Sequence, residues 1–375
     1  FLMIRRPPRS TLSSSSAASD VYKRHFFMTP ALQRGLSEGR IDYIPMQMRA
    51  AYDYIQGCAL DIALLQVARD VNGEIRFGPG MEFVEAALHG AAKVVLQVNT
   101  EMTAPIGCPL LEMNASYLLL EKACPPIIYS KPEVGSVELE IAKLVSSIIK
   151  DGDCLQTGVG KIPGAILSSL TNKNDLGFHG GLIEDGTMQL IVNGNLYGKR
   201  KAIDNGKHIA GVALGSKDLL HRGAQERSIC FSGVNYTHES NVIRRLDNFV
   251  SINSAMEVDL FGQVNAEFIS GFQVSGTGGS VDFMRAAKLS KNGRSIIALA
   301  STARRGKVSR IVPRVEMVTA LRTDVDMVVT EFGIARLKNT SWNERAKKLI
   351  EIAHPKFRDE LRGAFFSNIN YGSLN

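Results

Sequence analysis

The sequence has little cysteine and no long apolar run, and both absences narrow what the protein can be. Five cysteines occur in 375 residues, and they are widely spaced, odd in number and free of any Cys-x-x-Cys pair. This pattern argues against a disulfide framework and against a structural zinc site, so we expect a reducing compartment, the cytoplasm. No stretch reaches the ~18 consecutive apolar residues that a membrane-spanning helix requires, and we expect no membrane contact.

The first 24 residues differ in composition from the rest of the chain. Residues 5–9 contain three arginines and two prolines, and a run of four serines occupies 13–16. A secretory signal needs an apolar core of about 7 to 15 residues, which this segment lacks. The proline pair also breaks the amphipathic helix of a mitochondrial presequence. We therefore interpret residues 1–24 as a foreign or disordered tail.

The net charge of +7 depends strongly on that tail. The whole chain has 44 basic and 37 acidic residues, of which five basic residues and one acidic residue lie in this tail. The rest of the chain therefore has 39 basic and 36 acidic residues, a net charge of +3. No block of basic residues that alternates with aromatic residues remains in the sequence. Nucleic-acid binding is therefore not expected.

Strand-type and helix-type patterns alternate along the chain, which is typical of α/β proteins with mainly parallel sheets. The polar stretch 194–207, rich in Gly, Asn and Lys, favours a domain boundary near it. We expect one α/β half at 25–193 and another at 194–375. The predicted strands are 61–67, 93–98, 249–252, 295–299 and 327–329, and the predicted helices are 81–92, 137–150, 282–289 and 342–353.

A glycine loop at 158–162 follows a predicted strand and precedes a helix that we expect to begin near Pro163. Amide groups exposed at such a turn suit an anion, because the missing side chains allow close approach and the helix amino terminus is electropositive. The loop lacks the third glycine of a dinucleotide-binding fingerprint. A tight turn without a ligand is an equally good interpretation of this pattern.

A second glycine loop at 276–279 precedes the predicted helix 282–289. Two such loops in two α/β halves could face one ligand across a cleft between the domains. The alternative interpretation is that the loops are two unrelated turns, and their spacing does not decide between these interpretations.

Five longer strings are similar to signatures of the acetyl-CoA hydrolase/transferase family, which includes acetate and 4-hydroxybutyrate CoA-transferases. The resemblance covers nearly all of residues 25–365. It implies two similar open α/β domains with mainly parallel sheets, the CoA-transferase fold, with the active site between them. It also leads us to expect further chain ahead of His25. The strings are 250–265, 275–283, 309–313, 330–335 and 353–358.

The resemblance further implies the ligands and the assembly. Coenzyme A or acyl-CoA is expected as a substrate, with no permanently bound cofactor and no metal, and a small carboxylate is the expected acceptor. The protein is expected to form a homodimer. The residues that match the family's CoA contacts are Gly158, Val159, Gly160, Lys161 and Ile162 in the first loop, Asn253, and Gly276, Gly278 and Gly279 in the second loop.

The family's catalytic glutamate is missing from the string that resembles its surroundings. That glutamate attacks an acyl-CoA thioester and passes through a glutamyl-CoA intermediate, so the route depends on a carboxylate. The matching string at 179–186 places Gly181 at this position, and Glu184 follows three residues later. Glu184 is our predicted stand-in. Three residues along a strand correspond to roughly 10 Å and reverse the facing side, so an ordinary loop carboxylate is the alternative interpretation.

Other candidates for catalysis lie in the same strings. The carboxylates of Glu257, Glu267 and Glu331 are candidates for catalysis. The alternative is that each is a structural hydrogen-bond partner. His179 could act as a general base for attack by water, which would give a hydrolase, although a single histidine is more often structural. The sequence therefore predicts a CoA-transferase, with an acyl-CoA hydrolase and a CoA-binding protein without turnover as alternatives.

Overall fold

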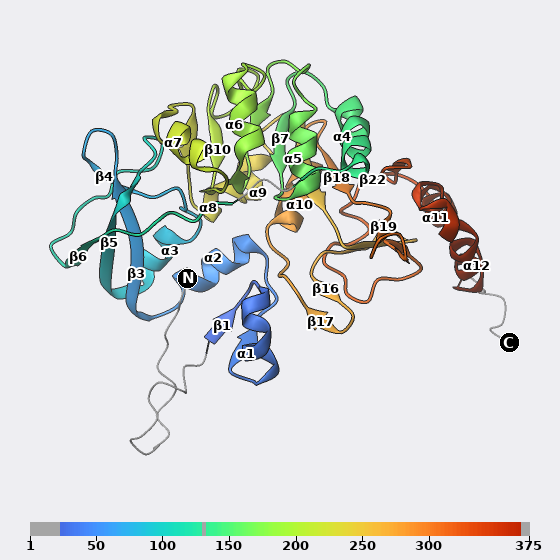
Figure 1. The fold of residues 1–375 in the computed structure, drawn as a ribbon, viewed down its shortest axis with the longest axis horizontal. Coiled ribbons are helices and arrows are strands. Elements are labelled where there is room, and N and C mark those ends of the chain that lie inside the picture. The colour runs from blue at the N-terminus through green and yellow to red at the C-terminus, as the bar shows by residue number, and fades with distance from the viewer. Residues whose placement is uncertain (1–22, 130–132, 369–375) are drawn as a thin grey trace.

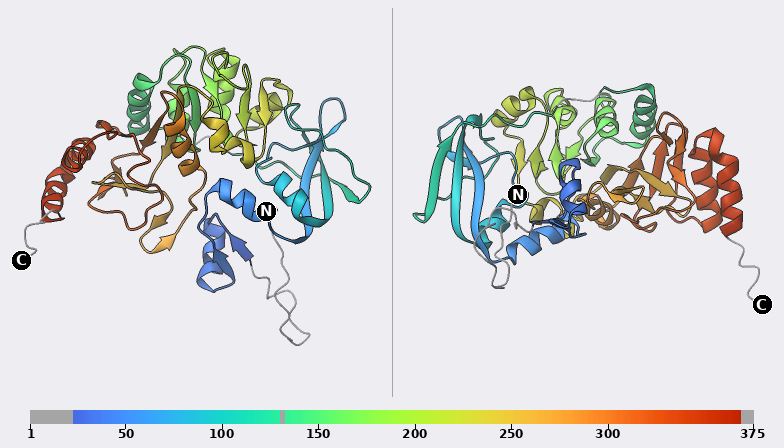
Figure 2. Two further views of the ribbon diagram at one scale, coloured as in Figure 1. Left: turned by 180° about the vertical axis from the view of Figure 1, so that it is seen from behind. Right: turned by 60° about the horizontal axis from the view of Figure 1, so that its bottom comes forward.

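Two open β-sheets of mainly parallel strands organise the computed structural model, which describes residues 23–129 and 133–368 (Figure 1). The views in Figure 2 place the smaller sheet, built from the first third of the chain, at one end of the molecule. The last two helices lie at the opposite end, and the larger sheet lies between them. The predicted α/β fold with mainly parallel sheets is confirmed.

The smaller sheet has the strand order β4-β3-β5-β6. The strands β3 (Leu60–Arg69), β5 (Ala91–Thr103) and β6 (Tyr117–Lys122) are parallel, and β4 (Ile75–Phe77) pairs with β3 in the antiparallel direction. Both strands predicted in this region are confirmed. The helix predicted at 81–92 is shorter, α3 (Val84–Gly90), because the chain becomes extended at the start of β5.

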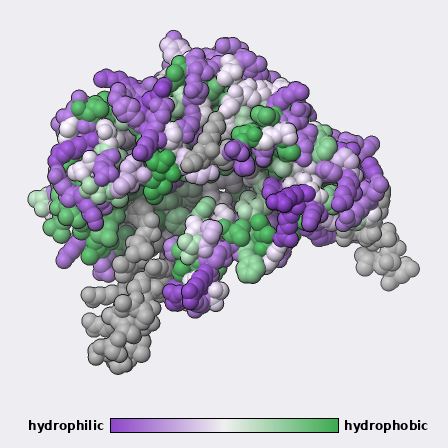
Figure 3. All heavy atoms as spheres, viewed as in Figure 1, coloured by the Kyte–Doolittle hydropathy of each residue, from purple (hydrophilic) through white to green (hydrophobic). Residues whose placement is uncertain are grey.

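One face of the smaller sheet is buried and the other exposes apolar side chains. Leu65 and Val67 of β3 are buried against helices α2 (Met48–Gln56) and α3, whereas Leu64, which points to the other face, is 65 % exposed. Figure 3 shows hydrophobic side chains along the left flank, where Figure 1 places these strands. This alternation follows from the two-residue period of a strand.

The larger sheet has the strand order β23-β22-β18-β13-β7-β8, and only β23 is antiparallel to its neighbour. The three strands predicted near 250, 297 and 328 are confirmed. Two strands of this sheet precede the boundary predicted at 193/194 and four follow it, so the sheet joins both halves of the sequence. The strands are β7 (Cys154–Thr157), β8 (Gly177–Phe178), β13 (Phe249–Ser254), β18 (Arg294–Ala298), β22 (Met327–Thr330) and β23 (Gly333–Arg336).

Helices cover both faces of the larger sheet. Val250 and Ile252 of β13 pack into the same cluster as residues of α4 (Ser136–Ile148) and α5 (Lys161–Ser168). Phe249, which points to the opposite face, packs with residues of α10 (Ser280–Leu289). Strands buried on both faces read as continuous apolar runs, which is why the sequence reveals them.

The remaining strands form separate small sheets of two or three strands. Within the described residues no helix is long and apolar enough to cross a membrane. The elements are β1 (Lys23–His25), η1 (Pro30–Leu32), α1 (Gln33–Ser37), β2 (Ile41–Tyr43), β9 (Leu182–Ile183), α6 (Asp185–Val192), β10 (His208–Ala210), β11 (Val212–Ala213), α7 (Lys217–Gln225), β12 (Ile229–Phe231), α8 (Val234–Thr237), α9 (Ser240–Ile243), β14 (Glu257–Asp259), β15 (Val264–Asn265), β16 (Phe268–Ile269), β17 (Phe272–Gln273), β19 (Thr302–Ala303), β20 (Val308–Ser309), β21 (Ile311–Val312), α11 (Trp342–Ile352), η2 (Pro355–Phe357) and α12 (Arg358–Asn368).

The last two residues of the predicted tail, 23 and 24, lie in a strand of the fold. Lys23 and Arg24 form β1 together with His25, and this strand pairs in parallel with β2. These two residues are therefore part of the fold. The rest of the predicted tail, residues 1–22, lies outside the described residues.

Candidate functional site

The first glycine loop lies at the carboxyl end of the larger sheet. It joins β7 to α5 and starts beside β13, where Ile252 pairs with Thr157. Gly160 has a φ of +129°, a conformation that residues with a β-carbon rarely adopt, and it directly precedes Lys161, the first residue of α5. Open α/β sheets bind ligands at this edge. The predicted strand-to-helix turn is confirmed, and its helix begins two residues before Pro163.

Behind this loop lies a buried network of polar side chains. The Gln156 amide nitrogen donates to Oδ1 of Asn253 at 3.2 Å, and its Oε1 accepts from Nδ2 of Asn253 at 3.1 Å and from the Ser251 hydroxyl at 2.8 Å. A β-carbon on Gly158 would lie 3.7 Å from Oδ1 of Asn253. The structure therefore brings together two of the predicted CoA contacts, Gly158 and Asn253.

A cavity of about 670 Å³ opens beside the first glycine loop. Val159 to Pro163 form one side of it, and the amino-terminal turn of α4 and the segment from Ala300 to Arg310 form the rest. Four cationic residues, Lys161, Arg304, Arg305 and Arg310, line this cavity together with the carboxylate of Glu138. Guanidinium groups bind phosphates with paired hydrogen bonds, so this lining suits a ligand with several phosphates.

The arginines of this cavity were missed by sequence reasoning. Arg304 and Arg305 adopt the left-handed conformation, with φ values of +50° and +58°, in the turn that leads from β19 to β20. A pair of arginines followed by Gly306 was the available signal, and Arg310 falls within one of the family strings. Their approach to the first glycine loop depends on the parallel pairing of β13 and β18.

The second glycine loop packs against the amino-terminal part of the described chain. The backbone N–H of Met48 donates to the carbonyl of Gly278 at 3.2 Å, and a β-carbon on Gly276 would lie 2.3 Å from the carbonyl oxygen of Phe26. Glycine is thus required at 276 by the close approach of another backbone segment. The lining of the cationic cavity does not include 276–279, so the CoA contacts predicted for Gly276, Gly278 and Gly279 stay predictions.

Gly181 lies between the polar network and a histidine. The preceding residue contacts the network, because a β-carbon on Gly180 would lie 3.3 Å from Cγ of Gln156. A β-carbon on Gly181 would lie 2.9 Å from Cε1 and 3.2 Å from Nε2 of His238. A glutamate at 181 would therefore have no room unless this histidine moved.

Glu184 points toward a different helix. It precedes α6, and its carboxylate lies against α5, where a β-carbon on Gly164 would lie 3.7 Å from Oε1. Glu184, Gly160 and Lys161 line a small cavity of about 20 Å³. The side chain is therefore close to the first glycine loop but faces α5, whereas position 181 faces His238. The role of Glu184 as a stand-in nucleophile stays a prediction.

His179, the predicted general base, is fully buried. Its Nε2–H donates to the carbonyl of Thr237 at 3.1 Å, which leaves the proton on this nitrogen. The ring lies near Tyr236 and Phe249, with ring centroids 6.0 and 6.5 Å away. Burial lowers the pKa of His179 to about 3, so the imidazole is neutral. These contacts are those of a core histidine.

His238 is a residue that sequence reasoning missed. Its ring packs on Phe283 with centroids 4.3 Å apart, and its Nδ1 lies 2.8 Å from the hydroxyl of Thr237. Only 2 % of the residue is exposed, and this burial lowers the pKa of His238 to about 3. No local pattern in the sequence links it to Gly181, because the two positions are separated along the chain and meet only in the fold.

The other carboxylates from the family strings serve as hydrogen-bond acceptors within the described chain. Glu267 accepts from the hydroxyls of Tyr43 and Thr319 at 2.8 and 2.9 Å. Glu331 accepts from the backbone N–H and the hydroxyl of Ser301, and Glu257 accepts from a side-chain amide. These partners agree with the structural interpretation of all three residues.

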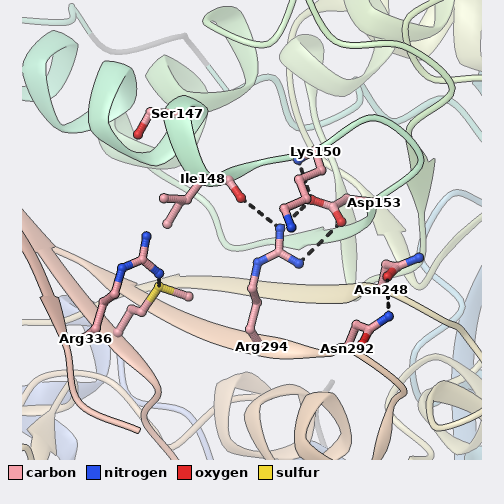
Figure 4. A pocket seen from close by; sticks show the side chains of 9 residues that line it. Ser147, Ile148, Lys150, Asp153, Asn248, Asn292, Arg294 and Arg336 are labelled. Atoms are coloured by element: carbon pink, nitrogen blue, oxygen red, sulfur yellow. Dashed lines mark hydrogen bonds and ion pairs between the residues drawn. The ribbon is translucent and has the colours of Figure 1, made fainter.

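A further cavity of about 490 Å³ lies at the opposite, amino-terminal edge of the larger sheet (Figure 4). Arg294 donates to Asp153 at 2.5 Å and to the carbonyl of Ile148 at 2.9 Å, which fixes the end of α4 to the start of β7. Arg336 points toward Met327 rather than toward this pair. Because these polar side chains bond to neighbouring parts of the fold, we interpret the lining of this cavity as structural.

Comparison with known proteins agrees with the resemblance in the sequence. Residues 11–107 match the acetyl-CoA hydrolase/transferase N-terminal domain, and residues 215–365 match the acetyl-CoA hydrolase/transferase C-terminal domain. The chain is 38 % identical to 4-hydroxybutyrate coenzyme A transferase of Clostridium kluyveri over 354 residues, 92 % of this chain and 82 % of that protein.

Two further proteins show the range of the similarity. The acetyl-CoA hydrolase of Yarrowia lipolytica is 26 % identical over 87 % of this chain and 71 % of its own length. The crystal structure of RipA from Yersinia pestis superposes with a TM-score of 0.86 at 33 % identity, covering 92 % of this chain and 80 % of that one. On these matches and on its fold, the chain belongs to the acetyl-CoA hydrolase/transferase family.

Proposed function

We propose that this protein binds an acyl-CoA thioester and transfers the CoA group to a small carboxylate. The observation that carries the proposal is the cavity beside the first glycine loop, where Lys161, Arg304, Arg305 and Arg310 meet. Coenzyme A carries a pyrophosphate and a 3′-phosphate, and these groups match a wall of cations and exposed amides. The relatives are named for reactions of CoA thioesters.

In this proposal the nucleotide of CoA occupies the cationic cavity, and its thiol arm runs toward Gly181. A row of neighbouring residues connects the cavity with Gly181. The first glycine loop lies against Asn253, Asn253 bonds to Gln156, and Gln156 lies against Gly180. The thioester then reaches the position that corresponds to the family's nucleophile.

CoA transfer needs a carboxylate that attacks the thioester, and Glu184 is our candidate for that role. Its carboxylate lies near Lys161 beside the first glycine loop, on the side of α5, so it must turn from α5 toward Gly181 to reach the thioester. The acyl group would form a mixed anhydride with this carboxylate, and the released thiolate would then form a glutamyl thioester. An acceptor carboxylate completes the exchange.

Hydrolysis is the second candidate, and Gly181 favours it. Glycine at this position does not supply the carboxylate that transfer requires, so water would take its place as the group that attacks the thioester. Attack by water releases free CoA and the carboxylic acid, as the name of the Yarrowia lipolytica relative describes for that protein.

We also propose that CoA is bound only as a substrate, and that the protein works as a homodimer in the cytoplasm. Among the described residues no group of three or more His, Cys, Asp or Glu side chains is arranged to hold a metal ion. The homodimer rests on the family resemblance, and the location rests on the five unpaired cysteines. Light scattering after size exclusion tests the dimer.

One experiment separates these reactions. The purified chain is incubated with butyryl-CoA and ¹³C-labelled acetate, and the products are identified by mass spectrometry. Labelled acetyl-CoA demonstrates transfer, and hydroxylamine trapping should then modify Glu184, whereas Glu184→Gln should abolish the labelled product. Free CoA with butyrate and no labelled acetyl-CoA demonstrates hydrolysis. Binding of CoA with no product of either kind would leave a CoA-binding protein and contradict both enzyme proposals.

A further inference from the structure

A carboxylate from outside the family strings, that of Glu82, is held close to Gly181 by backbone hydrogen bonds. The N–H of Gly211 donates to the carbonyl of Gly181 at 3.0 Å, and the N–H of Met81 donates to the carbonyl of Gly211 at 2.8 Å. Glu82 directly follows Met81. Its own carbonyl accepts from the N–H of Val234, the first residue of α8, at 2.8 Å. The backbone of Glu82 is therefore fixed on both sides.

The side chain of Glu82 extends over Gly211. A β-carbon on Gly211 would lie 3.2 Å from Cγ of Glu82 and 2.9 Å from the carbonyl oxygen of Gly181. A larger residue at 211 would therefore be crowded by both neighbours. The Glu82 side chain and the Gly181 carbonyl thus lie against the same glycine. This contact places a carboxylate beside the position where the family carries its nucleophile.

The surroundings of Glu82 do not neutralise its carboxylate. Within the described residues we find no hydrogen bond and no ion pair of this group, and part of the residue is exposed. Burial raises the pKa of Glu82 to about 7. Among the titratable groups on nearby elements, Tyr52 of α2 interacts with Glu85 of α3, and His238 after α8 is neutral, so none of them supplies a positive charge. Unpaired carboxylates with a raised pKa are concentrated at functional sites.

We propose that Glu82 is a catalytic base that activates water for hydrolysis of an acyl-CoA thioester held at Gly181. The proposal rests on the acyl-CoA binding proposed above and assigns a residue to its hydrolytic branch. The Glu82 carboxylate accepts a proton from water while the water oxygen forms a bond to the thioester carbonyl carbon. The tetrahedral intermediate then breaks its carbon–sulfur bond. The protonated Glu82 returns the proton to the CoA thiolate, which gives a carboxylic acid and free thiol.

The position and the pKa of Glu82 suit a base that acts through one water molecule. Such a base lies one water away from the reacting carbon, and Glu82 is separated from Gly181 by the backbone of Gly211. A pKa of about 7 leaves a substantial fraction of the Glu82 carboxylates ionised at neutral pH. The same pKa allows the group to release its proton again to the thiolate in the second step.

A structural role of Glu82 would have the opposite effect on stability. Because burial disfavours the ionised carboxylate, the uncharged amide of Glu82→Gln resembles the form that the fold prefers. This variant is therefore expected to melt at the same temperature as the wild type or at a higher one, while hydrolysis falls. A carboxylate that only holds the fold together would lose stability on the same substitution.

The test measures thiol release from acetyl-CoA by the full chain in H₂¹⁸O, together with CoA affinity and melting temperature. The variants are Glu82→Gln and Glu82→Asp, and the control is Glu74→Gln, because Glu74 lies exposed between β3 and β4. We expect Glu82→Gln to lower the rate by about 100-fold or more, with CoA affinity within about threefold of the wild type. Glu82→Asp, which keeps a carboxylate, should retain more activity. The wild-type rate should rise with pH through about 7, as Glu82 ionises, and place ¹⁸O in the acetate.

The outcomes distinguish a failure of this inference from a failure of the proposed function. No thiol release and no labelled acyl exchange by the wild type would contradict both. Acyl exchange without thiol release, or thiol release that is unchanged in Glu82→Gln, would contradict the role of Glu82 alone. Equal losses in Glu74→Gln, or a lower melting temperature of Glu82→Gln, would also contradict it. So would an acylated Glu82 trapped by hydroxylamine, because a base forms no bond to the acyl group.

Discussion

The imidazole of His238 packs against the backbone of Gly181, at the position where a side chain of residue 181 would begin. One residue of this pair has no side chain, and the other has a ring that hydrogen-bonds to Thr237 and packs at a tilt on Phe283. The two positions are therefore coupled sterically. A side chain at position 181 is expected to be tolerated only with a smaller residue at position 238.

The first prediction tests this coupling through stability. Gly181→Ala should lower the free energy of unfolding by about 1–3 kcal/mol, because the added methyl group would lie 2.9 Å from Cε1 of His238. The same substitution in a His238→Ala background should cost less. Urea unfolding of the two single variants and the double variant measures the interaction. Additive effects of the two substitutions would show that the residues do not contact each other.

The second prediction concerns the cationic cavity. Arg304→Ala and Arg305→Ala should each weaken CoA binding by about tenfold, which corresponds to the loss of about one charge-assisted hydrogen bond. Both residues line the cavity beside the first glycine loop. Calorimetry with CoA measures the effect, with Arg222→Ala as the control, because Arg222 pairs with Asp218 on the exposed surface of α7. Wild-type affinity in both cavity variants would place the phosphates elsewhere.

The third prediction concerns the polar network behind the loop. Asn253→Ala leaves the buried amide N–H of Gln156 without its acceptor, and an unsatisfied buried group costs about 1–3 kcal/mol of stability. The control is Gln189→Ala, which removes an exposed hydrogen bond to Asn193 and should change stability by less than about 0.5 kcal/mol. Chemical unfolding of both variants provides the comparison, and equal effects would contradict the assigned burial.

The fourth prediction concerns acid stability, to which buried groups contribute with opposite signs. Burial lowers the pKa of His208 to about 4 and of His238 to about 3, so the unfolded state binds more protons below about pH 6.5 and stability is lost as the pH falls. Burial raises the pKa of Asp282 to about 7, so the folded state binds the extra proton and acid favours folding.

Two variants should therefore change the pH dependence in opposite directions. Between pH 7 and pH 5, His208→Gln should reduce the loss of unfolding free energy, and Asp282→Asn should enlarge it. The expected slope for each group is on the order of 1 kcal/mol per pH unit. Urea titrations at several pH values measure these slopes. Parallel pH profiles for the two variants and the wild type would contradict the burial of these side chains.

The sequence predicts the framework of the site because that framework is local. The apolar run of β13 and the glycines at 158 and 160 specify a buried strand and a strand-to-helix turn by themselves. Asn253 follows from the same strand, since its position at the carboxyl end of β13 brings it beside β7. Neighbouring residues and the parallel pairing of strands are enough to predict these features.

The residues that the sequence analysis missed depend on distant contacts. His238 meets Gly181 through the packing of α8 against the segment between β8 and β9, and no periodicity connects residues 57 positions apart. Arg304 and Arg305 are carried to the first glycine loop by the turn after β19. A resemblance in motifs shows where a nucleophile is missing, but only the fold shows which side chain occupies its space.

The most direct test of this account is a crystal structure of the full chain with CoA. We predict phosphate oxygens within hydrogen-bonding distance of Arg304, Arg305 or Arg310 and of the amides that begin α5, with the thiol directed toward Gly181. CoA bound in the cavity around Arg294, at the amino-terminal edge of the sheet, would contradict it. So would a thiol directed away from Gly181.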